Sequence, residues 1–380
     1  MKTLNVGIIG YGFMGKVRAY GHQVLPIFYD PAPAVCRITR ICDGVEAVAR
    51  KGAAALGAEA VTDFRRVTES PDIDLVHVCT PNHLHAEPVL SAMRHGKSVL
   101  VDKPLTATLE ESRQIAALMP AYRGTGQMAL HSRFFPATMR AKQLVDGNFL
   151  GQVLEFRASY LHAGSADPKA PLKWKLAAAT GGGIIADLAS HVLDVMQWLL
   201  GDYAQILAAT HIAYPERPSA DEPGKMIRVD AEDAVMILAR MKCGALGHLE
   251  ATKLATGSED ELRFEIHGSK GALRFNTMAP HHLEAYDGTV PDSPLGGNRG
   301  WTRIDCGQRY PAPAGFPGPK FAIGWLRSHL ACLAAFVENA AAGRPGDPGL
   351  EQGVRVQELM ELCRESAKQG KWVDCSTTRS

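Results

Sequence analysis

The sequence predicts two domains, an α/β domain with a parallel sheet followed by a domain built on an antiparallel or mixed sheet. Three observations support this prediction. Short apolar strands alternate with helical stretches over the first third of the chain, as in a parallel sheet covered on both faces. A glycine-rich turn joins the first strand to the first helix. Later in the chain, several strands follow one another through short turns, as in antiparallel sheets.

The length and composition agree with this organisation. The chain has 380 residues, of which 46% are hydrophobic, enough for two domains with large cores. Its 41 Lys and Arg nearly balance its 40 Asp and Glu, so no surplus of positive charge indicates a nucleic-acid partner. No apolar run reaches the roughly 20 residues that span a membrane. We recognise no signal peptide at the start of the chain.

The cysteines indicate the compartment. Eight of them are scattered along the chain, and none has the two-residue spacing of a zinc or redox motif. Cys79 lies within an apolar stretch, where a reduced thiol packs as a small hydrophobic group. We therefore expect a reducing, cytoplasmic location and a soluble protein, most often an enzyme.

The elements of the first domain alternate in type. We expect strands at 4–9, 37–42, 74–79, 98–101 and 127–130, and helices at 14–25, 45–56, 83–94 and 109–119. The strands are short and mostly apolar, which is typical of strands buried on both faces. We place this domain at residues 1–125.

The remaining residues, 126–380, are expected to form the second domain. Its main helix is expected at 184–200, and its strands at 153–160, 204–211, 234–241, 245–252, 262–267 and 272–275. Residues 287–319 are rich in Pro and Gly, which predicts a long surface loop. Two helices, at 325–341 and 350–368, end the chain, and we expect that they can pack back against the first domain.

A nucleotide-binding turn is predicted between the first strand and the first helix. The sequence there follows the pattern G-x-G-x-x-G, which in this context is typical of dinucleotide-binding domains. The first glycine permits a tight turn, the second lets the backbone approach a pyrophosphate, and the third lets the helix pack closely on the strand. The helix N-terminus would attract the phosphates. An ordinary Gly-rich turn is the alternative. The residues concerned are Gly10, Tyr11, Gly12, Phe13, Met14 and Gly15.

An acidic residue after the second strand bears on the choice of cofactor. Asp43 follows Cys42 at the end of that strand, where an acid hydrogen-bonds the adenosine ribose and disfavours a 2′-phosphate. An exposed Asp-Gly turn is the alternative interpretation. Arg37 and Arg40 could instead serve a 2′-phosphate, so NAD is favoured and NADP stays open.

Two further loops lie at the carboxyl ends of predicted strands, the edge at which doubly wound sheets bind ligands. A lysine directly after a buried strand is unusual there, although a solvated surface lysine is the alternative. The candidate cofactor-binding residues of these loops are Thr80, Pro81, Asn82, His85, Asp102 and Lys103.

A second polar cluster is predicted at the start of the main helix of the second domain. After three glycines at 181–183, Asp187 and His191 are four residues apart and share one helix face. Because the surrounding residues are apolar, we expect the two side chains to be paired. A buried structural pair is the alternative. A metal site would need ligands such as His131 and His162, and no ligand spacing supports it.

Together these residues resemble the Gfo/Idh/MocA family of oxidoreductases over nearly the whole chain. The likeness includes the glycine turn, the segment at 79–86, Asp102-Lys103-Pro104, the segment at 181–191 and the segment at 264–268. The sequence departs from the family in three places. It has Asp102 where the family usually has Glu, Ala189 for a usual Gly, and His131 for a common Asn, which can alter the pocket.

The resemblance implies an α/β Rossmann domain plus an α+β domain with an open, mostly antiparallel sheet. It implies an NAD-dependent enzyme with Lys103, Asp187 and His191 as catalytic residues. In that role His191 would accept a proton, Asp187 would orient it or bind a neighbouring hydroxyl, and Lys103 would stabilise the reacting oxygen. It also implies a homodimer or homotetramer formed through the second sheet.

Within the family, the segments at 160–168, 171–175 and 215–218 resemble the levoglucosan dehydrogenase branch. That resemblance implies oxidation of a secondary hydroxyl, at C3, of an anhydrosugar, sugar or glycoside. Besides the three catalytic residues, the candidate substrate-binding residues are His131, Arg133, Tyr160, His162, Trp174 and Lys175. Trp174 could offer an apolar face to a sugar, or be a packed core indole.

Three other functions stay open from the sequence. An inositol or aldose dehydrogenase would perform the same chemistry on another ring. A non-catalytic regulator could bind NAD and a sugar without turnover, although the three retained catalytic residues argue against it. An NAD-dependent glycosidase would oxidise its substrate transiently and release an aglycone without net NADH formation.

Overall fold

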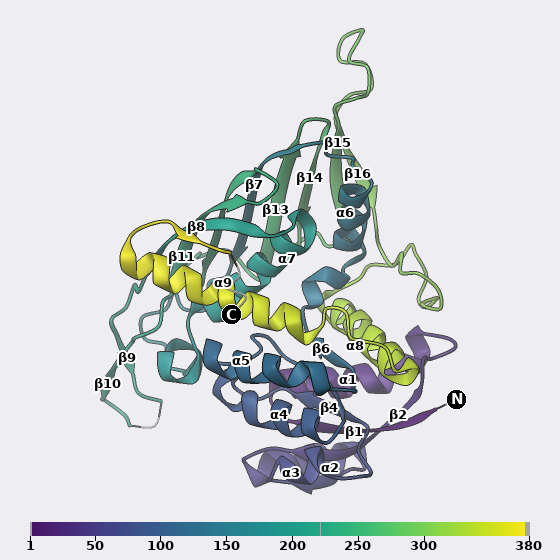
Figure 1. Cartoon of the computed structure of the whole chain (residues 1–380), viewed down its shortest axis with the longest axis vertical. Helices are drawn as coiled ribbons and strands as arrows, with labels where there is room; N and C mark the ends of the chain where they lie inside the picture. The colour runs from purple at the N-terminus through teal and green to yellow at the C-terminus, as the bar shows by residue number, and fades with distance from the viewer. Residues whose placement is uncertain (1, 221, 377–380) are drawn as a thin grey trace. The chain divides into compact units, whose positions relative to one another are not determined.

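The computed structural model describes residues 2–220 and 222–376, which fall into two compact units (Figure 1). The first unit comprises Met1–Phe134, Tyr310–Gly318 and Gly324–Gln357. The second comprises Phe135–Arg309, Pro319–Ile323 and Glu358–Ser380. The chain thus passes into the second unit after Phe134 and later returns to the first.

The first unit contains a six-stranded parallel sheet. Its strand order, β3-β2-β1-β4-β5-β6, reverses direction between β1 and β4, which creates the crevice where such sheets bind ligands. The parallel α/β prediction is therefore confirmed. The strands are β1 (Thr3–Ile9), β2 (Val35–Cys42), β3 (Glu59–Val61), β4 (Leu75–Val78), β5 (Ser98–Val101) and β6 (Gly126–Met128).

Helices surround this sheet, and one of them comes from the end of the chain. Gly21 of α1 lies against α8, where an added Cβ would stand 2.6 Å from Leu333 Cδ2. The lack of a side chain at Gly21 therefore permits close packing of the two helices. The helices are α1 (Phe13–Phe28), α2 (Glu46–Leu56), α3 (Arg65–Thr68), α4 (Ala86–Arg94), α5 (Leu109–Leu118) and α8 (Trp325–Ala342). α9 (Leu350–Gln369) begins in this unit and ends in the second.

The second unit contains a nine-stranded sheet of order β16-β15-β14-β13-β7-β12-β11-β8-β17. Neighbouring strands are antiparallel except for β7 and β12, which are parallel, so the predicted mostly antiparallel sheet is confirmed. The strands are β7 (Val153–Leu161), β8 (Tyr203–His211), β11 (Ala234–Met241), β12 (Leu246–Thr252), β13 (Glu261–Gly268), β14 (Gly271–Asn276), β15 (His282–Asp287), β16 (Trp301–Asp305) and β17 (Val373–Asp374). A separate hairpin pairs β9 (Glu216–Pro218) with β10 (Met226–Arg228).

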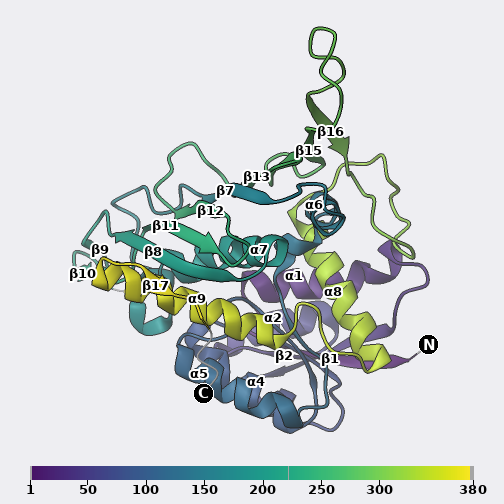
Figure 2. The same cartoon turned by 45° about the horizontal axis from the view of Figure 1, so that its top comes forward.

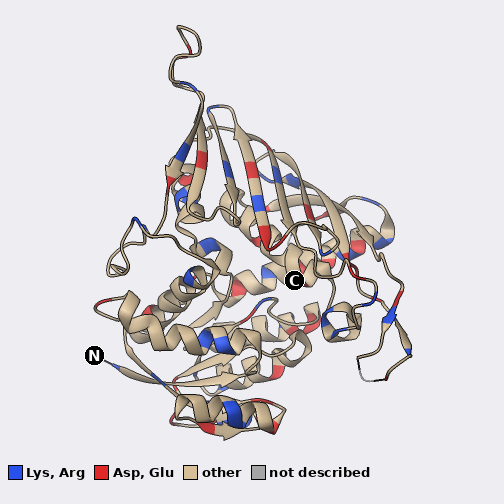
Figure 3. Cartoon of the chain, turned by 180° about the vertical axis from the view of Figure 1, so that it is seen from behind, with Lys and Arg blue, Asp and Glu red and all other residues tan. Residues whose placement is uncertain are grey.

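The two faces of this sheet differ in character. Along β11, buried and exposed residues alternate strictly after its first position, because successive side chains point to opposite faces. Helices α6 (Pro136–Asp146) and α7 (Ser190–Leu200) pack on the buried face. The opposite face carries interspersed basic and acidic residues (Figure 3).

The main helix of the second unit is more apolar than the sequence analysis recognised. The stretch Ala178–Leu200 is long and apolar enough to cross a membrane, but 83% of its apolar 18-residue window is buried inside the protein. A core helix of a soluble protein has the same composition. Figure 2 shows α7 lying against the strands of its own sheet.

The loop predicted at 287–319 contains one strand. Residues Trp301–Asp305 form β16, the edge strand of the large sheet, and pair with β15. Its residues are almost all exposed, so the pattern of alternating burial that predicts a strand is absent there.

Candidate functional site

The three glycines of the nucleotide turn have different steric surroundings. Gly10 has a φ of +86°, and a Cβ there would stand 2.7 Å from the Cys79 carbonyl oxygen. A Cβ on Gly15 would stand 2.1 Å from the Gly10 carbonyl oxygen, so both positions exclude a side chain. A Cβ on Gly12 would meet nothing within 4 Å. Gly12 therefore leaves open space beside the start of α1, as the approach of a pyrophosphate to the backbone requires.

Asp43 joins the end of β2 to this turn. One carboxylate oxygen accepts a hydrogen bond from the Tyr11 backbone N–H at 2.9 Å, and the other accepts one from Val45 N–H at 2.9 Å. A carboxylate has about four acceptor positions, so these two bonds leave capacity for ribose hydroxyls. The glycine turn and Asp43 together fit the diphosphate and ribose of NAD.

His85 connects the loop after β4, which contains Thr80, to the loop after β5, which contains Lys103 and Pro104. This side chain is 1% exposed, and its two ring nitrogens lie 2.9 Å from the Pro104 carbonyl oxygen and 2.8 Å from the Thr80 carbonyl oxygen. Burial lowers the pKa of His85, opposed by hydrogen bonding to Thr80 and by the charge of Asp102. His85 thus fixes the spacing between the Thr80 loop and the lysine loop.

Lys103 follows β5 and has a charged neighbour on its N-terminal side. Its backbone N–H donates to Asp102 Oδ1 at 3.0 Å. The same oxygen lies 4.0 Å from Nη2 of Arg18, a residue of α1 that is almost completely buried. Asp102, the aspartate that replaces the usual glutamate, therefore connects the backbone of Lys103 to the first helix of the nucleotide domain.

Two further predicted residues of the first unit are buried. The His131 ring stacks on His329 at a centroid distance of 3.9 Å, and its Nδ1 lies 3.1 Å from the Ser328 hydroxyl. Burial, followed by the charges of Arg18 and Lys103, lowers the pKa of His131 to about 3. His131 is therefore a neutral imidazole at physiological pH. Arg133 donates to Gln352 Oε1 at 2.9 Å.

In the second unit, Asp187 lies at the centre of a cluster of charges. It belongs to a π-helical segment, Ile185–Ala189, that leads into α7. Lys175, one of the predicted substrate-binding residues, has its Nζ 3.0 Å from Asp187 Oδ1. Lys253 Nζ contacts the other oxygen, Oδ2. Sequence reasoning missed Lys253, although it directly follows a strand, the same signal that singled out Lys103.

A glycine and a glutamate hold the start of this helical segment. Glu232 accepts a hydrogen bond from Ile185 N–H through Oε1 at 3.0 Å, and its backbone carbonyl accepts one from Ile184 N–H at 2.8 Å. Gly183 has a φ of +106°, and a Cβ there would stand 2.4 Å from Glu232 Oε1. The glycine run therefore makes room for the carboxylate that caps the helix.

His191 lies against Tyr160 from the central strand β7. The two rings meet edge to face with centroids 5.6 Å apart. The Tyr160 hydroxyl donates to Asp260 Oδ1 at 2.6 Å, and burial raises the pKa of Tyr160 well above its usual range. Tyr160 therefore stays neutral and its proton is already committed to Asp260, a residue that the sequence analysis did not select.

The other two candidates lie in the segment before the glycine run. His162 Nδ1 accepts a hydrogen bond from Gly164 N–H at 2.7 Å, which makes Nε2 the protonated nitrogen of the neutral ring. Trp174 is 36% exposed, and Lys175 Nζ lies 5.7 Å from its ring centroid. Trp174 is thus partly exposed rather than a core indole.

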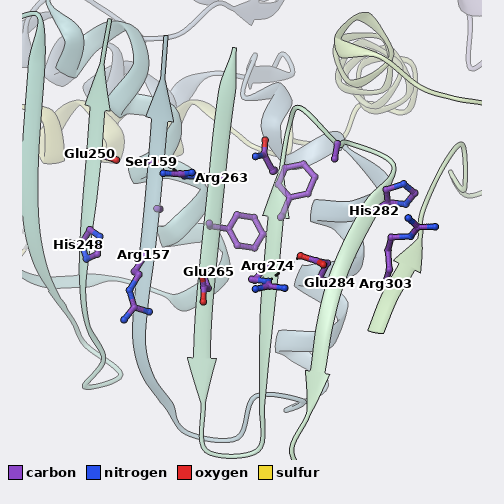
Figure 4. Close-up of a pocket in the computed structure, with 15 residues that line it drawn as sticks. Arg157, Ser159, His248, Glu250, Arg263, Glu265, Arg274, His282, Glu284 and Arg303 are labelled. Atoms are coloured by element: carbon purple, nitrogen blue, oxygen red, sulfur yellow. Dashed lines mark hydrogen bonds and ion pairs between the residues drawn. The ribbon is translucent and has the colours of Figure 1, made fainter. Parts of the chain in front are cut away.

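A cavity of about 730 Å³ lies on the face of the nine-stranded sheet opposite its helices (Figure 4). Its lining includes Arg157, Arg274 and Arg303 beside Glu265 and Glu284. None of the predicted site residues lines it. Among residues 2–220 and 222–376, no group of three His, Cys, Asp or Glu side chains could hold a metal ion.

Comparison with known proteins identifies the family. Residues 4–128 match the oxidoreductase family with an NAD-binding Rossmann fold, and residues 138–274 match the GFO/IDH/MocA C-terminal domain. The chain is 33% identical to levoglucosan dehydrogenase of Pseudarthrobacter phenanthrenivorans, over 98% of each chain. It is 26% identical to inositol 2-dehydrogenase of Rhizobium meliloti, over 75% of this chain and 79% of that one.

Solved structures agree with this result. Levoglucosan dehydrogenase in complex with NADH and levoglucosan has a TM-score of 0.93 and 32% identity, covering 98% of this chain and 99% of that one. An oxidoreductase domain protein from Kribbella flavida has a TM-score of 0.91 and 32% identity, covering 99% and 100%. The chain belongs to the Gfo/Idh/MocA family of NAD-dependent oxidoreductases and is related to levoglucosan and inositol dehydrogenases.

Proposed function

We propose that this protein is a sugar dehydrogenase that oxidises a secondary hydroxyl, at C3, of an anhydrosugar, sugar or glycoside to a ketone. The observation that carries the proposal is the ionic cluster in which Lys175 lies 3.0 Å from Asp187, four residues before His191. A carboxylate and an ammonium side by side can accept from and donate to neighbouring hydroxyls. The full-length similarity to levoglucosan dehydrogenase supports the substrate class.

The proposed chemistry assigns one task to each residue. His191 accepts the proton of the reacting hydroxyl, because a neutral imidazole is a suitable base near pH 7. Lys103 donates a hydrogen bond to the same oxygen and stabilises its developing negative charge. Asp187 orients His191 or holds an adjacent hydroxyl. When bound, NAD would accept the hydride that leaves the substrate carbon.

The substrate contacts are proposed from exposure and hydrogen-bonding capacity. Lys175 is 44% exposed at its side chain and can reach a ligand hydroxyl. The partly exposed ring of Trp174 offers an apolar surface to the C–H face of a sugar. His131, Arg133, Tyr160 and His162 complete the proposed set of substrate-binding residues. A neutral polyol agrees with the near-zero net charge of the chain.

Product analysis tests the position of oxidation. The protein is incubated with NAD and, separately, levoglucosan, glucose, a methyl glucoside and myo-inositol, and the products are identified by NMR. We expect a 3-keto product from levoglucosan or the glucoside. A ketone at another carbon would overturn the C3 assignment, and turnover of inositol or glucose alone would favour an inositol or aldose dehydrogenase. Aglycone release without net NADH would indicate a glycosidase, and absence of turnover a regulator.

We also propose that the protein forms a homodimer or homotetramer through the outer face of its large sheet. Met236, Leu238 and Leu246 are 54%, 46% and 53% exposed. They lie on the same face as His248, since Leu238 pairs with His248 across β11 and β12 and directly opposed residues share a face. Exposed apolar groups bordered by polar residues, as here beside the cavity lined by His248, are typical of interaction surfaces.

Light scattering on a sizing column tests this assembly. We expect the wild-type protein to be a dimer or tetramer and Leu238→Glu to shift it towards a monomer, because burial of a charge at an interface is unfavourable. Cys243→Ser, at an exposed position outside the strands, is the control. A monomeric wild type would refute the proposal.

We further propose a cytoplasmic location, which the eight free cysteines support.

A further inference from the structure

Lys253 is held in place by its backbone as well as by its side chain. It directly follows β12, its N–H donates to the Asp233 carbonyl at 3.1 Å, and its own carbonyl accepts from Ser165 N–H at 2.9 Å. Its side chain is 14% exposed. The ammonium of Lys253 therefore extends from a fixed point that joins the end of β12 to the segment before the glycine run.

The two lysines bound to Asp187 are not equivalent. Asp187 is 13% exposed at its side chain, Lys253 is 14% exposed, and Lys175 is 44% exposed. Lys253 contacts Oδ2, while Lys175 lies 3.0 Å from Oδ1 and 3.3 Å from Oδ2. A mostly buried carboxylate requires a partner charge, and the inner lysine supplies it permanently. The outer lysine is more accessible to solvent and to a ligand.

We propose that Lys253 is a positioning residue that keeps Asp187 ionised and in place, so that Lys175 is able to exchange Asp187 for a substrate hydroxyl. With Lys253 present, departure of Lys175 does not leave a buried carboxylate unpaired. This inference rests on the proposed function, because it assumes that Asp187 serves the oxidation of an alcohol.

Other charged and titratable groups surround Asp187 and bear on the test. The π-helical segment that carries it packs against β7, β11 and β12. Tyr160 lies on β7, and its pKa is raised in part by the charge of Asp187. Glu232 caps the segment at its start, and His191 follows it on α7. Lys175 and Lys253 are two cations that contact the Asp187 carboxylate.

Kinetics over pH distinguish positioning from a purely structural role. Removing a cation from beside a buried carboxylate favours its protonated form. The pKa of that carboxyl rises by roughly one unit or more when the cation was a close partner. For Lys253→Met we expect a lower kcat and an acidic limb of the kcat profile shifted to higher pH, with Lys253→Arg restoring both. For Lys175→Met we expect a raised KM with a smaller change in kcat. A Lys253→Met profile that coincides with that of the wild type would overturn the proposal.

Two controls separate this inference from folding and from the proposed function. Lys242→Met removes a lysine from an exposed ion pair with Asp202 in the same unit, and we expect wild-type kinetics. If Lys253→Met does not fold, Lys253→Gln takes its place. Carboxyl carbon NMR of ¹³C-Asp protein needs no substrate: the Asp187 signal should titrate at higher pH in the Lys253 variant. An unchanged titration refutes the role of Lys253, whereas absence of any NADH formation by the wild type refutes the proposed function.

Discussion

The Asp187 cluster shows how far single residues could be predicted. Asp187 and His191 stood out in the sequence because they are polar residues within an apolar helix, and their catalytic roles stay a prediction. Lys253 directly follows a strand, as Lys103 does, but its contact with Asp187 was not predictable, because the two residues lie 66 positions apart in sequence and meet only where β12 packs against the π-helical segment in the folded chain. Asp260, 100 residues from Tyr160, was missed for the same reason. Local patterns reveal residues on one element, whereas contacts between distant strands need the folded sheet.

Asp43 supports a prediction about cofactor choice. Asp43→Ala should weaken NADH binding by roughly ten- to a hundredfold, because hydrogen bonds to a charged group contribute about 1.5–3 kcal/mol. Loss of the negative charge should also improve NADPH binding relative to NADH. Asp43→Asn keeps an acceptor for Tyr11 N–H and controls for disruption of the turn. Calorimetric titration with both nucleotides measures the ratio, and an unchanged ratio in Asp43→Ala would assign the ribose to another residue.

At the scale of elements, the strands and helices that were predicted are those whose apolar residues form a clear pattern in the sequence. The strands β1, β4 and β5 of the parallel sheet were predicted because each is largely apolar along its length. β3, β9, β10 and β17 contain two or three residues each and are too short to show a period. α1 was expected to end at Leu25 but continues through Pro26 to Phe28.

Gly183, in the turn before the π-helical segment that carries Asp187, allows a prediction at this scale. Gly183→Ala should destabilise the protein by about 1–3 kcal/mol, since φ is +106° and an added Cβ would displace the Glu232 carboxylate. The expected result is a lower melting temperature together with reduced turnover, because Asp187 follows on the same segment. Gly300→Ala is the matched control, as a Cβ there meets nothing within 4 Å. Equal melting temperatures for the two variants would contradict this account of Gly183.

For the whole molecule, the sequence predicted two domains, and the structure divides the chain into two compact units after Phe134. The sequence analysis expected that the two terminal helices can pack back against the first domain, and the structure places α8 in the first unit, where it packs against α1. The net charge of +1 counts histidines as neutral and does not show that several of them are buried in the core. Two of them, His22 and His77, lie with their Nε2 atoms 2.7 Å apart and are buried.

These buried histidines predict how stability depends on pH. Burial, followed by the charge of Arg18, lowers the pKa of His22 to about 3, against 6.5 in the unfolded chain. Between these values the unfolded chain binds a proton that the folded chain does not, so the free energy of unfolding falls as pH decreases from about 6.5 towards about 3. Burial lowers the pKa of His77 as well, which adds to the same effect.

Urea unfolding at about pH 7 and about pH 5 measures this dependence. His22→Gln should lower the stability at pH 7 but also reduce the loss of stability on acidification. His95→Gln removes an exposed histidine and should keep the wild-type dependence. If His22→Gln loses as much stability on acidification as the wild type does, then His22 is not the group that titrates.

The central claim is that this chain transfers a hydride from a sugar hydroxyl to NAD with Lys103 in a catalytic role. The most direct measurement is NADH absorbance on addition of levoglucosan, glucose, a methyl glucoside or myo-inositol to the wild-type protein and to Lys103→Ala, alongside NADH binding to both. We expect sugar-dependent NADH formation by the wild type and a rate about 10²–10³-fold lower in Lys103→Ala, with NADH binding retained. Near-full activity in Lys103→Ala, or no NADH formation from any of these compounds by the wild type, would contradict the account.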